Sequence, residues 1–177
     1  RGTLSDRDVL VDYGQFLRSL VDVGSLRPLN VAVDAGNGMA GHTTPAVLGP
    51  IPSMTVFPLY FELDGTFPNH EPNPLEEENL RDLQKAVVEH GADLGLAFDG
   101  DADRCFVVDE RGEVVRASAI TALVGLREAA REVDARVPVE SALAVVPFVP
   151  LLRLAVACEA HVVLARQVGN RLTADAG

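Results

Sequence analysis

A short acidic run is the part of this sequence best equipped for chemistry. Asp99, Asp101 and Asp103 alternate with two small residues, and Arg104 closes the run. In an extended stretch, side chains two residues apart point to the same side, so the three carboxylates can converge on one point. Three like charges this close repel one another unless a cation lies between them. Because every ligand is a hard oxygen, the pattern favours Mg²⁺, Mn²⁺ or Ca²⁺ over zinc or copper.

The segments on either side of the acidic run are short and apolar. Residues 94–98 before it and 105–108 after it have the composition of strands, which places the carboxylates on a loop at strand ends. A solvated acidic turn is the simpler interpretation of such a run. We favour a metal site because a loop between two buried strands is expected to hold its carboxylates in order.

Two further segments contain residues suited to binding an anion or another ligand. Gly36, Asn37 and Gly38 follow a predicted strand and precede a predicted helix, where backbone N–H groups can turn toward a phosphate. The loop of residues 67–74 is stiffened by prolines, and its Asn69 and His70 could form the wall of a ligand site. The alternatives are a packing turn for the first segment and solvated side chains for the second.

Composition limits the classes of protein that fit this chain. It has 177 residues and a hydrophobic content of 47%, enough for one full domain or for one domain and part of another. The net charge of −11 argues against nucleic acid or an anionic membrane as a partner. No apolar run has membrane-spanning length, and the two cysteines show neither metal spacing nor disulfide density. We therefore expect a cytoplasmic location.

Alternating strands and helices are expected to position these segments. Besides the two strands around the acidic run, the pattern indicates strands at 30–33 and 54–57 and helices at 9–21, 80–90 and 117–133. This alternation predicts an α/β fold: a mixed, mainly parallel sheet with helices on its faces and an antiparallel pair at the acidic loop. Part of a second, similar domain is expected to follow. A boundary at about residues 110–117 divides the chain into domains 1–112 and 113–177.

Three motifs, in their order, make the sequence resemble a known enzyme family. The stretches V-D-A-G-N-G-M-A-G, F-P-N-H-E-P-N-P and G-L-A-F-D-G-D-A-D-R follow one another within residues 6–126. This order is similar to that of the α-D-phosphohexomutases, specifically the bacterial phosphomannomutase/phosphoglucomutase enzymes. The resemblance implies four domains around a central cleft. Residues 1–112 would form the second domain with its preceding linker helix, and 113–177 a partial, divergent third domain.

The resemblance also implies an activity and roles for the acidic run. Members of the family are isomerases that interconvert hexose 6-phosphate and hexose 1-phosphate, of mannose or glucose, through a phosphorylated serine. Asp99, Asp101 and Asp103 would bind Mg²⁺, with Mn²⁺ as an alternative, and Arg104 would contact the phosphate. Phosphoryl transfer depends mainly on positioning and charge neutralisation, and a metal ion with an arginine supplies the second.

Several parts of that family have no counterpart in this sequence. They are the phosphoserine loop, the sugar-recognition loop and the fourth domain, and the first residue is Arg1 rather than methionine. We therefore expect a fragment that is inactive alone. Its partner would be a phosphosugar substrate, which it would meet through domains outside this chain.

Two other kinds of site share parts of the pattern. A haloacid-dehalogenase-type phosphatase or mutase uses an aspartate nucleophile in a D-x-D motif after an apolar strand, although the fifth position there is usually Thr or Val. A calcium-binding module of the EF-hand type would use Asp99, Asp101, Asp103 and Glu110 at loop positions one, three, five and twelve. Arg104 then stands at position six, where the turn needs glycine, and the flanks have the composition of strands.

Overall fold

The computed structural model describes residues 2–133, and the structural statements below concern those residues. The strands are β1 (Leu29–Asp34), β2 (Met54–Leu59), β3 (Leu94–Phe98), β4 (Cys105–Asp109) and β5 (Val114–Val115). The α-helices are α1 (Leu10–Ser19), α2 (Ala40–Val47), α3 (Arg81–His90) and α4 (Ala117–Val133). Two short 3₁₀ helices, η1 (Val23–Ser25) and η2 (Glu77–Leu80), complete the described elements.

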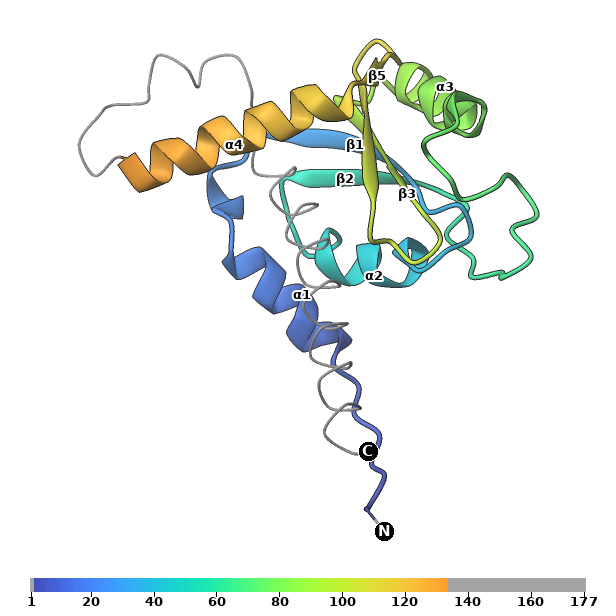
Figure 1. The fold of residues 1–177 in the computed structure, drawn as a ribbon, viewed down its shortest axis with the longest axis vertical. Coiled ribbons are helices and arrows are strands. Elements are labelled where there is room, and N and C mark those ends of the chain that lie inside the picture. Colours follow the sequence, from blue (N-terminus) through green and yellow to red (C-terminus); the bar gives the residue numbers. More distant parts are fainter. Residues whose placement is uncertain (1, 134–177) are drawn as a thin grey trace.

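A mixed sheet of five strands, in the order β2-β1-β3-β4-β5, lies at the centre of the molecule (Figure 1). β1 pairs in parallel with β2 and with β3. β4 runs antiparallel to both β3 and β5. The α/β class, the mixed sheet and the antiparallel pair around the acidic loop are therefore confirmed.

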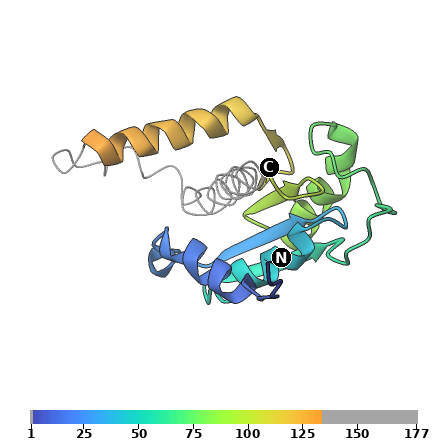
Figure 2. The same cartoon turned by 60° about the horizontal axis from the view of Figure 1, so that its bottom comes forward.

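Helices cover both faces of this sheet (Figures 1 and 2). Val31 and Val33 of β1 belong to a core cluster with residues of α1 and α2, whereas Ala32 belongs to a second cluster with α3. Because neighbouring residues of a strand point to opposite faces, this alternation places one apolar layer on each side. All three side chains are fully buried, as expected for a strand that is covered on both faces.

Local chemistry explains where two of the helices end. α3 ends at His90, and Gly91 has a φ of 57°, the left-handed conformation in which glycine closes a helix. At the end of α2, Arg18 from α1 donates Nη1 hydrogen bonds to the carbonyl oxygens of Ala46, at 2.6 Å, and Val47, at 3.0 Å. This cationic side chain satisfies carbonyls of the last turn of α2 and joins that helix to α1.

The last helix, α4, begins directly after the sheet. Its residues Ile120, Leu123 and Val124 pack against the same core cluster as α1 and α2. The division into domains 1–112 and 113–177 is not tested by this packing and stays a prediction. Most of the expected second domain, residues 134–177, lies outside the described part of the chain.

Candidate metal and phosphate site

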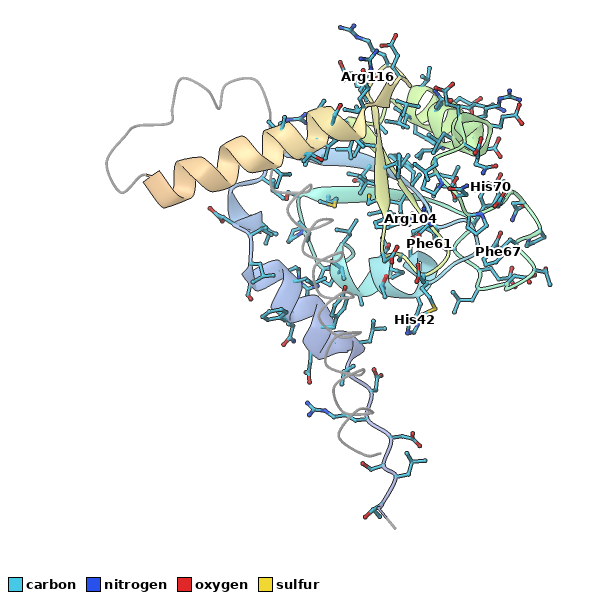
Figure 3. The ribbon with its side chains drawn as sticks, in the orientation of Figure 1. His42, Phe61, Phe67, His70, Arg104 and Arg116 are labelled. Carbon is cyan, nitrogen blue, oxygen red and sulfur yellow. The ribbon has the colours of Figure 1, made fainter. Side chains whose placement is uncertain are left out.

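The three sequence motifs meet at one edge of the sheet, where the parallel strands end. β1 ends at Asp34 and continues into the glycine turn, β2 leads into the proline-rich loop, and β3 ends just before Asp99. Figure 3 shows Phe67, His70 and Arg104 at this end of the molecule. Open α/β sheets bind their ligands beyond the carboxyl ends of the strands. The parallel pairing of β2, β1 and β3 therefore brings distant motifs to the position where a site is expected.

The acidic loop holds its three carboxylates close together. Asp99, Asp101 and Asp103 each offer one oxygen, and these oxygens all lie within 4.8 Å of one another. Ligands of an octahedral Mg²⁺ at about 2.1 Å are at most about 4.2 Å apart, so a small closure brings the carboxylates into range. Asp101 is exposed and Asp103 is partly buried, which leaves their side chains room for this movement. The oxygen donor set fits Mg²⁺ or Mn²⁺.

Asp99 organises this loop from the inside. Its Oδ1 accepts the backbone N–H groups of Asp103, at 3.0 Å, and of Arg104, at 3.1 Å, and its Oδ2 accepts Nε–H of Arg104 at 2.7 Å. Burial acts to raise the pKa of Asp99, but the hydrogen bonds from Arg104 and Asp103 and the charge of Arg104 together outweigh it and hold that pKa below its usual value. The carboxylate is therefore a fixed anion, around which Ala102 turns the chain with a φ of 60°.

Arg104 is anchored to the acidic loop and still reaches the surface. Its Nε lies 2.7 Å from Oδ2 of Asp99 and 3.6 Å from Oδ1 of Asp103, while its side chain is 48% exposed. The pKa of Arg104 is raised above its ordinary, already high value, and the hydrogen bond to Asp99 is the main cause. A planar guanidinium held in this way keeps a fixed orientation beside the loop, which suits contact with an anionic oxygen.

The glycine turn touches the acidic loop at Gly38. A Cβ atom at Gly38 would lie 2.6 Å from the carbonyl oxygen of Gly100, so no larger residue fits unless the acidic loop moves. Met39 donates its backbone N–H to the same oxygen at 3.0 Å. Asn37, with a left-handed φ of 60°, donates Nδ2–H to the carbonyl of Glu62 at 2.8 Å. The turn thus supports the acidic loop, and the phosphate-binding role of Asn37 and Gly38 stays a prediction.

Asn69 and His70 make their contacts with neighbouring parts of the protein. Asn69 donates Nδ2–H to Oδ1 of Asn37 at 2.7 Å. Nε2 of His70 lies 3.0 Å from Oδ2 of Asp34, Nδ1 lies 2.9 Å from the carbonyl oxygen of Glu71, and the side chain is only 15% exposed. The sequence predicts that both residues line the wall of a ligand site. In the structure they join loops of the site, and a direct contact with substrate stays a prediction.

The pair formed by Asp34 and His70 is not indicated by sequence reasoning. The side chain of Asp34 is 1% exposed, so its charge needs a partner inside the protein. The hydrogen bond to Asp34 is the main cause that raises the pKa of His70 to about 9, against the opposing effect of burial. At neutral pH the two residues form an ion pair. The available signal is an acidic residue that directly follows the apolar run of β1.

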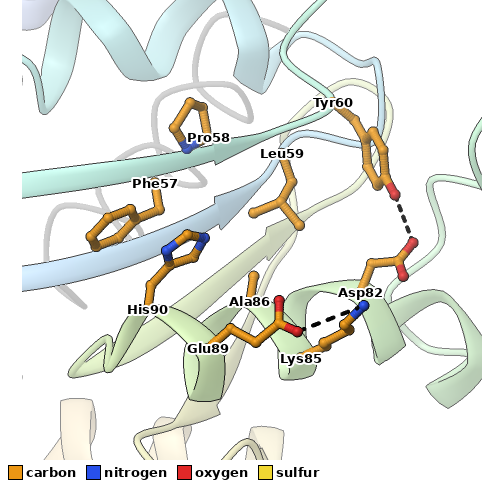
Figure 4. Close-up of a pocket in the computed structure, with 9 residues that line it drawn as sticks. All are labelled: Phe57, Pro58, Leu59, Tyr60, Asp82, Lys85, Ala86, Glu89 and His90. Atoms are coloured by element: carbon orange, nitrogen blue, oxygen red, sulfur yellow. Dashed lines mark hydrogen bonds and ion pairs between the residues drawn. The ribbon is translucent and has the colours of Figure 1, made fainter.

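A hollow of about 450 Å³ lies between β2 and α3 (Figure 4). Tyr60 there donates its O–H to Asp82 at 2.6 Å, and this bond is the main cause that raises the pKa of Tyr60 to about 12. Lys85 forms an ion pair with Glu89 at 3.7 Å. These polar and charged groups of the lining pair with one another, and the predicted site residues are not among those that line the hollow. We therefore assign no ligand to it.

The fold and the acidic loop define an α/β/α domain with a cluster of three carboxylates that could hold a metal ion, beside an arginine. A family model described as phosphoglucomutase/phosphomannomutase, alpha/beta/alpha domain II, matches residues 12–112. The chain belongs to the phosphoglucomutase/phosphomannomutase family. The resemblance seen in the three sequence motifs is thereby confirmed.

Similar proteins agree with this assignment. The chain is 44% identical over 114 residues to a phosphomannomutase/phosphoglucomutase of Pseudomonas aeruginosa. The aligned segment covers 64% of this chain and 24% of that relative. It is 41% identical over 125 residues to a phosphomannomutase of Salmonella montevideo, and this alignment covers 68% of the chain and 27% of that relative. A crystal structure of a phosphoglucomutase/phosphomannomutase family protein from Burkholderia thailandensis matches with a TM-score of 0.66 and 32% identity, covering 74% of this chain and 28% of that one. The chain spans about a quarter of the length of the curated relatives it matches.

Proposed function

We propose that this chain is the metal-binding part of a phosphohexomutase that interconverts hexose 6-phosphate and hexose 1-phosphate, of mannose, glucose or both. The observation that carries the proposal is the convergence of Asp99, Asp101 and Asp103 at the carboxyl edge of the sheet. The names of the relatives support the reaction class. In this proposal the phosphoserine and the contacts to the phosphosugar come from protein outside this chain. The chain alone is then inactive.

The acidic loop would contribute positioning and charge to this reaction, not a nucleophile. Mg²⁺ or Mn²⁺ bound by the three aspartates would offset negative charge on a phosphoserine and on the transferred phosphoryl group. Arg104, oriented by Asp99, would hold an anionic oxygen beside the loop. The pairing of Phe98 with Cys105 closes the loop at its base, so both ends are held by the sheet. Fixed geometry of this kind is what phosphoryl transfer requires.

The structure and the family match disfavour the two alternative sites. An EF-hand loop over residues 99–110 would lie between two helices, whereas β3 precedes it and β4 forms part of it. The haloacid-dehalogenase-type alternative is disfavoured by the family match, because residues 12–112 fit a phosphoglucomutase/phosphomannomutase domain.

The expected cytoplasmic location is part of this proposal. Within residues 2–133, the structure contains no helix long and apolar enough to cross a membrane. The low cysteine content, without disulfide density, is typical of a reducing compartment. A phosphosugar substrate, met through protein outside this chain, remains the proposed partner.

Calorimetric titration with Mg²⁺ and Mn²⁺ tests the metal assignment. Asp101→Asn removes the charge of one proposed ligand. The loss of an outer-shell partner typically lowers metal affinity roughly tenfold, so the affinity of this variant for Mg²⁺ and Mn²⁺ should fall by at least that much. Glu110→Gln is the matched control, because it removes one exposed charge from the turn that follows β4 and should leave the affinity unchanged. Equal affinities of Asp101→Asn and the wild type would contradict the assignment. Weaker binding of either ion by Glu110→Gln than by the wild type would favour the EF-hand alternative.

A further inference from the structure

We infer that Asp34 and His70 are positioning residues that hold the acidic loop in its metal-binding geometry. The inference rests on the metal site of the proposed function and adds two residues that support it. Both act through Gly100, which stands between Asp99 and Asp101. The position of Gly100 therefore affects the spacing of two of the proposed ligands.

Two loops contact Gly100. From the turn after β1, Met39 donates its N–H to the carbonyl oxygen of Gly100 at 3.0 Å, and Gly38 packs against the same peptide group. From the proline-rich loop, side-chain atoms of Pro72 and Phe67 lie 3.4 Å and 3.5 Å from the position that a Cβ of Gly100 would take. A shift of either loop therefore changes the packing around the acidic loop.

Asp34 joins these two loops to each other. Its Oδ1 accepts the backbone N–H of Gly36 at 2.8 Å, and its Oδ2 lies 3.0 Å from Nε2 of His70. Pro72, two residues beyond His70, packs on the same turn, since a Cβ at Gly36 would lie 3.2 Å from its Cβ atom. One buried carboxylate thus anchors both of the loops that contact Gly100.

The surroundings of His70 suit a fixed link better than a proton-transfer role. Nδ1 faces the carbonyl oxygen of Glu71, which can only accept a hydrogen bond, so Nδ1 carries a hydrogen. Nε2 donates to the carboxylate of Asp34, so both ring nitrogens are used. The ring of Tyr60 packs edge-on against the imidazole, with centroids 5.4 Å apart. The bond from Asn69 to Asn37, at 2.7 Å, links the same two loops a second time.

Positioning and electrostatics make opposite predictions for the removal of His70. An imidazolium repels a nearby divalent cation, so its loss would strengthen metal binding if charge dominated. If positioning dominates, its loss releases the proline-rich loop and weakens metal binding. Outer-shell partners of metal ligands typically contribute 10- to 100-fold to affinity. Because this link acts through Gly100, we expect the dissociation constant for Mn²⁺ to rise by about tenfold.

Titration of the 177-residue chain with Mn²⁺, with the free ion followed by electron paramagnetic resonance, measures this effect. His70→Ala leaves the Asp34 charge buried without its partner and can prevent folding, so the double variant Asp34→Ala/His70→Ala is the main test. Asp34→Asn is the rescue variant: its Oδ1 can still accept from Gly36, and its Nδ2 can donate to a neutral His70. Arg27→Ala is the control, because it breaks an ion pair with Asp93 at the opposite end of β1 and β3.

The double variant should bind Mn²⁺ about tenfold more weakly, whereas Asp34→Asn and Arg27→Ala should bind it like the wild type. Hydrogen exchange of the Met39 amide, compared with that of Val33 in β1, provides a readout without metal and should accelerate selectively in the double variant. Wild-type affinity and unchanged exchange in the double variant would overturn the inference. A wild-type chain that binds no Mn²⁺ would defeat the proposed metal site, and the Met39 exchange would still decide whether the pair positions the loop.

Discussion

At the scale of single residues, Asp99 shows how a buried charge is kept in the proposed site. A carboxylate that is 2% exposed needs partners that replace water, and the loop supplies two backbone N–H groups and the Arg104 guanidinium. The same contacts fix the orientation of Arg104. One aspartate thus serves as a metal ligand in our proposal and as the anchor of the arginine beside it.

Substituting Arg104 by lysine separates the charge of this residue from its shape. Lysine keeps the positive charge but lacks the planar fork with which an arginine can bind two phosphate oxygens at once. In the complete mutase that we propose, Arg104→Lys should lower kcat by roughly ten- to a hundredfold, the equivalent of about 1.5–3 kcal/mol of charge-assisted hydrogen bonding. Steady-state kinetics and calorimetry make the comparison, with Arg81→Lys, at an exposed position at the start of α3, as the control. We expect Mg²⁺ affinity to stay near wild type; normal turnover would mean that Arg104 only neutralises the aspartates.

The raised pKa of His70 predicts a loss of stability at alkaline pH. The folded state binds the proton more tightly, with a pKa of about 9, than the unfolded chain with its ordinary value near 6.5. The stabilisation is therefore complete below about pH 6.5 and disappears as the pH rises through about 9. Because the ring is partly solvated, we expect a loss on the order of 1–2 kcal/mol.

Urea denaturation between pH 6 and pH 9.5 measures this dependence. Asp34→Asn is the control, since its neutral amide removes the ion pair and should flatten the curve over the same range. A wild-type stability that stays constant or increases across this range would show that His70 is not held as an imidazolium.

At the scale of elements, local signals account for most of what the sequence predicts. Gly91 ends α3 as expected, and the predicted helix over residues 117–133 coincides with α4. The apolar stripe over residues 9–21 extends beyond α1, which begins at Leu10 and ends at Ser19. Phe16 in this stripe is 45% exposed. The sequence does not predict this exposure, because helical periodicity does not reveal how much of an apolar face is covered.

The contact between α1 and α2 provides a prediction at this scale. Arg18→Ala removes two hydrogen bonds to the last carbonyls of α2, and we expect the free energy of unfolding to fall by about 1–2 kcal/mol. Arg7→Ala is the matched control, since its ion pair with Asp12 is exposed and should contribute little. Urea denaturation of both variants at pH 7 makes the comparison. Equal stabilities would mean that packing alone holds the two helices together.

At the scale of the whole molecule, the order of the strands assembles the site. The sequence predicts the acidic run, the glycine turn and the proline-rich loop as separate motifs, because each has its own local pattern. Their convergence depends on β1 lying between β2 and β3, a long-range pairing that no single segment specifies. The partnership of Asp34 with His70, 36 residues apart, was hidden for the same reason. The individual candidates could therefore be read from the sequence, but the network that links them could not.

Anomalous diffraction from crystals of this chain grown with Mn²⁺ tests the central claim most directly. The metal assignment predicts a strong anomalous peak surrounded by carboxylate oxygens of Asp99, Asp101 and Asp103. The Asp101→Asn variant, crystallised in the same way, should show a weaker peak or none. A wild-type structure at saturating Mn²⁺ without a peak between these three side chains would contradict the claim that this loop is the metal site.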